Sequence, residues 1–399
     1  MPEDPTVSNP EAVDREKAAA AAHQPIVPAV AASVREPAAA VPSRERWHSK
    51  GLTGATGWLS RQTTPHLMWL LRRPAAGPLA GTVAVFIFFA IASVGNAFLT
   101  AGGTASWLDP AAELGIVAIP VGLLMMGGEF DLSIASVLEA SALTVSVASG
   151  RYGVPLPLSI AMALAIAAVV GLLNGIITVR TRVPSFIVTL ATYLALDGAT
   201  LALTTLLTST VTVSLTTRGA VHSIFAGSFH QFRSSIVWCL AIALVAGWIL
   251  SRTAFGNWLL ATGGDRDTAR DAGVPTDRVK IILFVCSSLG AALLGIIQAI
   301  EYNGSQLGQG QSYIFDAIAA SVIGGVLLRG GYGSVTGIVF GAMTYSIIGA
   351  GIYYTGWDPN LAEVFIGVLV LAAVLANNVL RSLAMRDKAP VRLREPRRS

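Results

Sequence analysis

The sequence contains about ten apolar runs, each long enough to cross a lipid bilayer. They lie near residues 77–99, 111–127, 132–149, 155–179, 184–206, 235–251, 279–300, 313–328, 333–354 and 361–380. An apolar run of about 20 residues spans the hydrocarbon core as an α-helix, whereas a transmembrane β-barrel shows alternating segments of about ten residues. The pattern therefore predicts an all-α, polytopic membrane protein. The third and fifth runs are rich in Ser, Thr or Gly, so either could be broken or re-entrant.

The charge content agrees with this class, and the ends of the chain differ from its middle. Only 13% of the residues are charged, against about 25% in soluble domains. Residues 1–75 begin with an Ala- and Pro-rich stretch that cannot bury a core, so we expect a disordered tail, to which residues 51–75 could add an interfacial helix. The membrane domain is expected over 76–381, followed by a basic tail over 382–399.

The distribution of Lys and Arg predicts the orientation in the membrane. With the N-terminus inside and ten spans, 24 of the 27 basic residues fall on the inner side. Because inner loops carry the excess of basic residues, both termini and the polar stretch 251–280 are predicted to be cytoplasmic. The outer side then holds only Arg151, Arg218 and Arg233.

Residues 251–280 form a charged stretch between two apolar runs and contain the signals of one short helix. Asp265 can cap it, 266–272 can be helical, and Gly273 suits the position after its end, while Pro275 forbids continuation. A helix of about seven residues is not stable alone in water. It therefore needs a surface to dock on, such as a second protein; the alternative is a solvated loop with one frayed turn.

The sequence offers no metal, cofactor or catalytic constellation. Cys239 and Cys286 both fall in apolar runs, and the five His do not cluster, so no metal site is predicted. The phosphate-binding motif that an ATP-hydrolysing subunit needs is also missing from the sequence. We predict a transport subunit rather than an enzyme, in contact with lipid and not with nucleic acid.

Four sequence blocks resemble the ribose-type permeases of sugar-importing ABC transporters. In order along the chain they are 127–137, then 174–175 with 183–192, then 261–265 with 269–274, then 315–325 with 330–337. The resemblance covers about 77–380. Glu129 departs from it, because the family usually has an apolar residue there.

The resemblance implies a type II ABC importer permease in the inner, cytoplasmic membrane. Its partners would be cytoplasmic ABC ATPase subunits, an extracytoplasmic sugar-binding protein, and a second permease subunit, identical or different. The substrate would be a small sugar of the pentose or hexose class; a nucleoside or an autoinducer is the alternative within the family. The ATPase-coupling loop would comprise Gly264, Asp265, Arg266, Asp267, Ala269, Arg270, Asp271 and Gly273.

Candidate pathway residues come from the same blocks, and each also has a structural interpretation. They are Asn174, Phe186, Thr189, Thr192, Gly127, Gly128, Gly324 and Gly325. Gly pairs at corresponding places in two halves suggest helices broken beside a pathway. The Thr residues could instead bond to their own helix backbone, the spacing of Gly171 and Gly175 could mark a close helix contact near Asn174, and Asp131 could cap a helix that begins at Leu132.

Two further questions remain open at this point. Arg218 and Arg233 could pair with acidic residues of a binding protein, although most lone surface Arg residues have no such role. A self-sufficient secondary transporter is the rival class, and it would need a carboxylate deep in a span. Most acids lie near predicted span ends, Glu113 among them; Glu139 is the exception.

Overall fold

A computed structural model describes residues 75–386, and within them the chain is helical apart from four short strands. The predicted tail up to residue 74 and most of the basic tail lie outside the described residues. The helices are α4 (Ala76–Ala92), α5 (Ala101–Met126), α6 (Ile134–Val145), α7 (Leu156–Thr181), α8 (Ser185–Thr208), α9 (Ala220–Ala226), α10 (Ser235–Arg252), α11 (Ala254–Gly264), α12 (Arg266–Asp271), α13 (Thr276–Glu301), α14 (Tyr313–Ile323), α15 (Val335–Thr355) and α16 (Leu361–Arg386).

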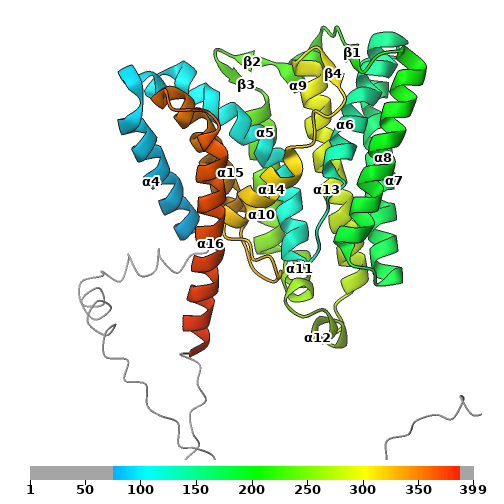
Figure 1. Ribbon diagram of the computed structural model, residues 1–399. Coiled ribbons are helices and arrows are strands. Elements are labelled where there is room, and N and C mark those ends of the chain that lie inside the picture. Colours follow the sequence, from blue (N-terminus) through cyan, green and yellow to red (C-terminus); the bar gives the residue numbers. More distant parts are fainter. Residues whose placement is uncertain (1–74, 387–399) are drawn as a thin grey trace, which may run out of the picture. The chain divides into compact units, whose positions relative to one another are not determined.

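The strands form two small antiparallel pairs at the end of the helical domain opposite α12 (Figure 1). One pair joins β1 (Thr212–Ser214) to β4 (Gly304–Gln306), with Val213 opposite Ser305. The other joins β2 (Ser228–Phe229) to β3 (Phe232–Arg233). The strands therefore cover one end of the domain, and α11 and α12 lie at the other.

All ten predicted runs are helical, but their lengths differ from the prediction. Six helices are long and apolar enough to cross a membrane, namely α5, α7, α8, α10, α13 and α15. Three shorter apolar segments are α4, α14 and the first part of α16, over Leu361–Leu375. The fifth run, suspected of a break, is the continuous helix α8.

Two of the predicted spans are interrupted. The third run gives only the twelve residues of α6, followed by a π-helical turn over Ser146–Arg151. The eighth run ends early because α14 stops at Ile323, where the pair 324–325 breaks the helix. Short helices of this kind are found in transporters where the backbone turns inside the protein rather than in lipid.

The second span begins ten residues before its predicted start. Thr100 caps α5 by accepting a hydrogen bond from the backbone N–H of Gly103. Asp109 and Pro110, which precede the predicted run, lie within the helix. This correction places Glu113 in the middle of α5 instead of near its end.

Three long helices form the centre of the domain. Most of α5 and α13 is buried, as is much of α15, whereas α7, α8 and α10 expose most of their apolar residues. A close helix contact joins α7 to α13, where a β-carbon on Gly171 would lie 2.7 Å from the carbonyl oxygen of Phe284. A β-carbon on Gly175 would lie 2.9 Å from the Cα atom of Ile281. The predicted small-residue contact at Gly171 and Gly175 is confirmed.

Candidate translocation pathway and coupling surface

The two predicted glycine pairs break their helices with the same backbone geometry. The pair 127–128 follows α5 and the pair 324–325 follows α14. Gly128 and Gly325 both have φ +84°, a conformation that L side chains rarely adopt. In each case the next residue donates its N–H to the carbonyl five residues earlier, which closes the helix end. The internal repeat indicated by the sequence is thus present in the backbone.

Asp131 accepts hydrogen bonds that hold the chain between the first break, at residues 127–128, and α6. Its Oδ1 atom accepts hydrogen bonds from the backbone N–H of Ser133 at 2.9 Å and from the Ser133 hydroxyl at 2.6 Å. Its Oδ2 atom accepts from the Ser287 hydroxyl of α13 at 2.8 Å. Asp131 therefore binds the residue that precedes α6. The prediction that it caps a helix beginning at Leu132 was wrong, because α6 begins at Ile134 and its N-cap is Ser133, without a side-chain cap hydrogen bond.

Asn174 joins the same buried network and connects three helices. Its side-chain amide donates to the Ser133 hydroxyl at 2.9 Å, and its amide oxygen accepts from Thr192 at 2.6 Å. Asn174 is fully buried. Because a buried polar side chain is costly unless it is hydrogen-bonded, this arrangement fixes α7 and α8 against the start of α6.

Thr189 holds the extended chain beside the break. Its hydroxyl accepts the backbone N–H of Leu132 at 3.1 Å and donates to the carbonyl of Ser185 at 2.9 Å. Thr192 likewise donates to its own helix, at the carbonyl of Val188. The back-bonding interpretation is confirmed for both Thr residues. Phe186 is not part of this group, because 51% of its surface is exposed while Thr189 is completely buried.

Glu129 is paired with a residue that the sequence had not singled out. Its carboxylate accepts a hydrogen bond from the ammonium group of Lys280, at the start of α13. Lys280 and Glu129 are only 6% and 9% exposed. The unusual acid at position 129 therefore neutralises a buried Lys, and the two side chains join the first break to α13.

The predicted short helix is confirmed as α12, which ends one residue earlier than expected. The Oδ1 atom of Asp265 accepts the backbone N–H groups of Asp267 and Thr268 at 3.1 and 3.0 Å. Gly273 follows the helix with φ +86°. The hydrogen bonds from Thr268 and Asp267 hold the pKa of Asp265 below its usual value. The cap is thus complete at neutral pH and is lost as the pH falls through this lowered pKa.

Charges divide α12 into an anchored side and a free side. Arg266 and Arg270 both donate to Oδ1 of Asp277, which lies in the first turn of α13. Asp267 and Asp271 are exposed, and neither forms an ion pair with another described residue. The two arginines therefore attach the helix to α13, and the two aspartates remain available to a partner.

Glycine residues bring α11 into direct backbone contact with the first break and with residues 330–331, in the segment between the second break and α15. A β-carbon on Gly263 would lie 1.8 Å from the carbonyl oxygen of Met126. A β-carbon on Gly331 would lie 2.7 Å from the Cα atom of Gly264, and one on Gly330 would lie 2.9 Å from the Cα atom of Gly128. The Gly331 N–H also donates to the Met126 carbonyl at 2.8 Å. We call these residues the glycine junction.

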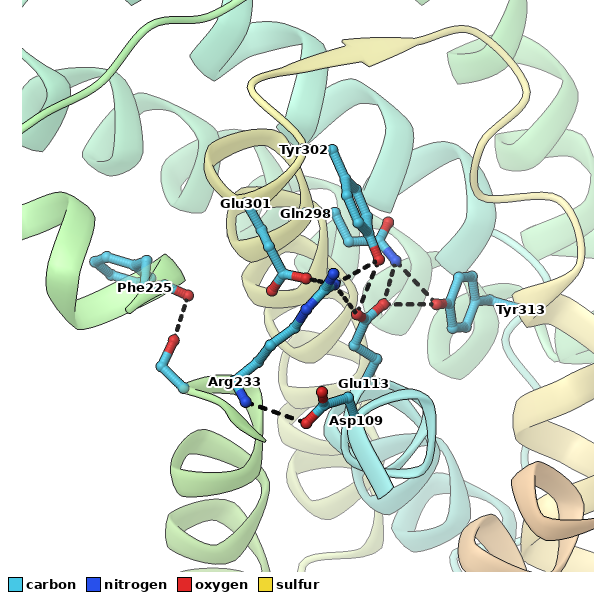
Figure 2. Close-up of polar contacts among 9 residues, drawn as sticks. Asp109, Glu113, Phe225, Arg233, Gln298, Glu301, Tyr302 and Tyr313 are labelled. Carbon is cyan, nitrogen blue, oxygen red and sulfur yellow. Dashed lines mark hydrogen bonds and ion pairs between the residues drawn. The ribbon is translucent and has the colours of Figure 1, made fainter. Parts of the chain in front are cut away.

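At the opposite end, a polar cavity of about 970 Å³ lies between α5, α13, α14 and the strands. Glu113 lines it, and Figure 2 shows this residue among the side chains of Gln298, Tyr302, Tyr313 and Arg233. The carboxylate of Glu113 accepts hydrogen bonds from Gln298 at 2.8 Å, from Tyr302 at 3.1 Å and from Tyr313 at 3.2 Å. Glu113 is only 4% exposed. Sequence reasoning missed this cluster, although Gln298, Glu301 and Tyr302 recur at helical spacing at the end of an apolar run.

Of the two arginines predicted to dock a binding protein, one is already engaged within the protein. The guanidinium of Arg233 pairs with Glu301, lies 4.0 Å from the Glu113 carboxylate and stacks over the ring of Tyr302 at 5.5 Å (Figure 2). Arg218 is exposed in the segment before α9, away from any described ion pair. Arg218 is therefore exposed without an ion pair to another described residue, and the same is true of Arg151.

Comparison with known proteins decides the family. The family model for permease components of branched-chain amino acid transport systems matches residues 103–374. The chain belongs to this family. The permease is 31% identical over 300 residues to the ribose import permease protein RbsC of Escherichia coli K12, covering 74% of this chain and 92% of that protein.

Other sugar permeases are similarly related. The permease is 29% identical over 323 residues to the fructose import permease protein FrcC of Rhizobium meliloti, covering 78% of this chain and 87% of that protein. It is also 29% identical over 321 residues to the xylose transport system permease protein XylH of Haemophilus influenzae, covering 66% and 85%. No solved structure matches the chain significantly. The permease is thus a multi-pass membrane transport subunit of an ABC system.

A carboxylate deep in a span, which the rival class of secondary transporter requires, is present twice. Glu113 and Glu139 are both buried within helices, so the expectation that only Glu139 lies deep in a span was wrong. Glu113 accepts three hydrogen bonds, and one oxygen of Glu139 accepts the backbone N–H of Gly308 at 2.8 Å while its Oε1 atom has no hydrogen-bond partner among the described residues. The family assignment, rather than the position of the acids, decides the class.

Proposed function

We propose that the permease imports a small neutral sugar of the pentose or hexose class, driven by separate cytoplasmic ATPase subunits and supplied by an extracytoplasmic binding protein. The substrate class is supported by relatives that carry the names of ribose, fructose and xylose permeases over most of their lengths. A second permease subunit would complete the pathway. The exposed apolar surfaces of α7, α8 and α10 would face this subunit or lipid.

The observation that carries this proposal is the geometry of α12. The helix is capped by Asp265, anchored on α13 by two arginines, and placed at the end of the domain with free acidic side chains. A short helix with these properties suits docking on a separate protein. The coupling segment 264–273 would therefore receive the ATPase, and α11 would transmit its movement to both breaks.

The candidate pathway residues take two different roles in this proposal. The glycine pairs 127–128 and 324–325 would act as the points where the short helices turn. Asn174, Thr189 and Thr192 are occupied by hydrogen bonds within the protein, so we propose that they hold the first break in place. Arg218 remains the candidate for docking of the binding protein.

Reconstitution tests the function directly. The full-length permease is placed in liposomes with its ATPase and binding protein, and uptake of labelled D-ribose, D-xylose, D-fructose and L-leucine is measured with and without ATP. We expect ATP-dependent uptake of at least one of the sugars. L-leucine is included because the family model is named for amino acid transport. Uptake of leucine alone would contradict the proposed sugar specificity.

The orientation can be tested with two cysteine substitutions in a protein that lacks Cys239 and Cys286. Ser228 on β2 and Thr268 on α12 are both exposed and lie at opposite ends of the domain (Figure 1). If α12 is cytoplasmic, an impermeant thiol reagent added to intact cells should label Ser228→Cys but not Thr268→Cys. Opening the cells should expose the second site as a positive control. Labelling of Thr268→Cys from outside would reverse the proposed topology.

A further inference from the structure

The polar cavity that Glu113 lines has the size of a small-molecule site. Its volume of about 970 Å³ lies at the upper end of the range of about 300–1,000 Å³ that ligand pockets usually have. Its walls come from α5, α13, α14 and both strand pairs, so segments far apart in the sequence meet there. The strands that line the cavity lie at the end of the domain opposite α12 (Figure 1).

Several polar groups of this cavity have unused hydrogen-bonding capacity. The amide nitrogen of Gln309 is buried and has no hydrogen-bond partner. Asp109 is 7% exposed and uses one oxygen to accept the backbone N–H of Arg233 at 3.1 Å. The amide nitrogen of Gln298 donates to Glu113 and Tyr313, which leaves its amide oxygen to accept. A ligand could therefore find both donors and acceptors here.

The charge of the cavity limits what such a ligand can be. Arg233 is the one cation among the described residues that line it, and its guanidinium is already paired with Glu301. Asp109, Glu113 and Glu301 supply three carboxylates around this single cation. A ligand carboxylate or phosphate would meet acids without a free counter-charge, and like charges placed together are costly. A neutral polyhydroxyl molecule has no such penalty.

We propose that this cavity is a binding site for a neutral sugar, which the sugar occupies before it passes the two breaks. Sugar hydroxyls would donate to Asp109 and to the amide oxygen of Gln298, and would accept from the free amide nitrogen of Gln309. Tyr302, which lines the cavity and is 56% exposed, offers an aromatic face. This inference rests on the proposed function and assigns a place within the permease to its substrate.

The test uses the purified full-length permease in lipid nanodiscs, without partners. Saturation-transfer difference NMR is recorded with D-ribose, D-xylose, D-fructose, L-leucine and D-ribose 5-phosphate as probes. We expect saturable binding of at least one neutral sugar and none of leucine or the phosphate. Gln309→Leu should weaken sugar binding roughly three- to tenfold, which corresponds to the loss of one hydrogen bond.

Two further variants keep the test decisive. Gln309→Glu retains the oxygen that accepts the backbone N–H of Gln306 but removes the donor, so it should weaken binding even if Gln309→Leu fails to fold. Gln311→Leu, an exposed exchange in the same segment outside the cavity wall, should leave the affinity unchanged. Unchanged sugar affinity in both Gln309 variants, or leucine binding as tight as sugar binding, would refute the proposed sugar site.

The outcomes separate this inference from the proposed function. If the reconstituted transporter takes up sugar but the permease alone binds none, the proposed sugar site is refuted and the proposed function of sugar import stands. If the reconstituted transporter moves leucine and no sugar, the proposed function is refuted. Sugar binding that depends on Gln309, together with sugar uptake, supports both.

Discussion

Glu129→Gln should destabilise the permease by about 3 kcal/mol or more, because it leaves the ammonium group of Lys280 buried without a charged partner. Both residues are less than one-tenth exposed, so water cannot readily replace the lost carboxylate. The pair also joins the first break to α13, so its loss should loosen the segment before α6. The measurement is the midpoint of thermal unfolding of the purified protein in detergent, together with its level in the membrane.

A double substitution provides the control for this effect. Replacing Glu129 by Leu and Lys280 by Met removes both charges, and exchange of a buried ion pair for apolar residues is often neutral or stabilising. We therefore expect the double variant to recover most of the lost stability, whereas Lys280→Met alone should resemble Glu129→Gln. Normal stability of both single variants would show that the pair is hydrated and contributes little.

Ala269→Pro should abolish ATP-driven uptake while leaving the protein in the membrane. Ala269 is 5% exposed, and its N–H donates to the Asp265 carbonyl at 3.0 Å as the first intrahelical bond of α12. Proline removes this donor and costs about 3 kcal/mol in a helix interior. A helix of six residues has too few other bonds to retain its shape. The readouts are uptake, binding-protein-stimulated ATPase activity, and co-purification of the ATPase.

The matched control at this position is Ala269→Ser, which keeps the N–H and adds a single oxygen atom. It should retain most of the uptake and the ATPase association. Arg270→Glu is a second probe, because it places an acid beside Asp277 where the structure has an ion pair. If Ala269→Pro retained wild-type uptake, ATPase stimulation and ATPase association, α12 would be an ordinary surface turn.

The sequence predicted best those features whose signals lie within a few residues. The cap at Asp265, the stop at Gly273 and the two glycine breaks are local, because each depends on backbone conformations that only certain residues adopt. All were found in the structure. The contact between Gly171 and α13 could also be predicted from the sequence, since two small residues four apart lie on one helix face.

The features that the sequence did not reveal depend on partners far along the chain. Lys280 lies 151 residues from Glu129, and Gln298 lies 185 residues from Glu113, and no local pattern indicates such pairs. The start of α5 was misplaced by ten residues, since Asp109 and Pro110 lie inside the helix. The candidate pathway residues Phe186 and Thr189 differ in burial, since Phe186 is 51% exposed and Thr189 is buried.

The glycine junction also determines how stiff the permease is between α11 and the two breaks. Where three backbones touch without side chains between them, there are no rotamers to yield and no voids to absorb displacement, and a packed interior is nearly incompressible. A shift of α11 by a fraction of an ångström must therefore displace the chain after α5 and the chain before α15 together. Two halves of the fold that are far apart in the sequence would then move together when α11 moves.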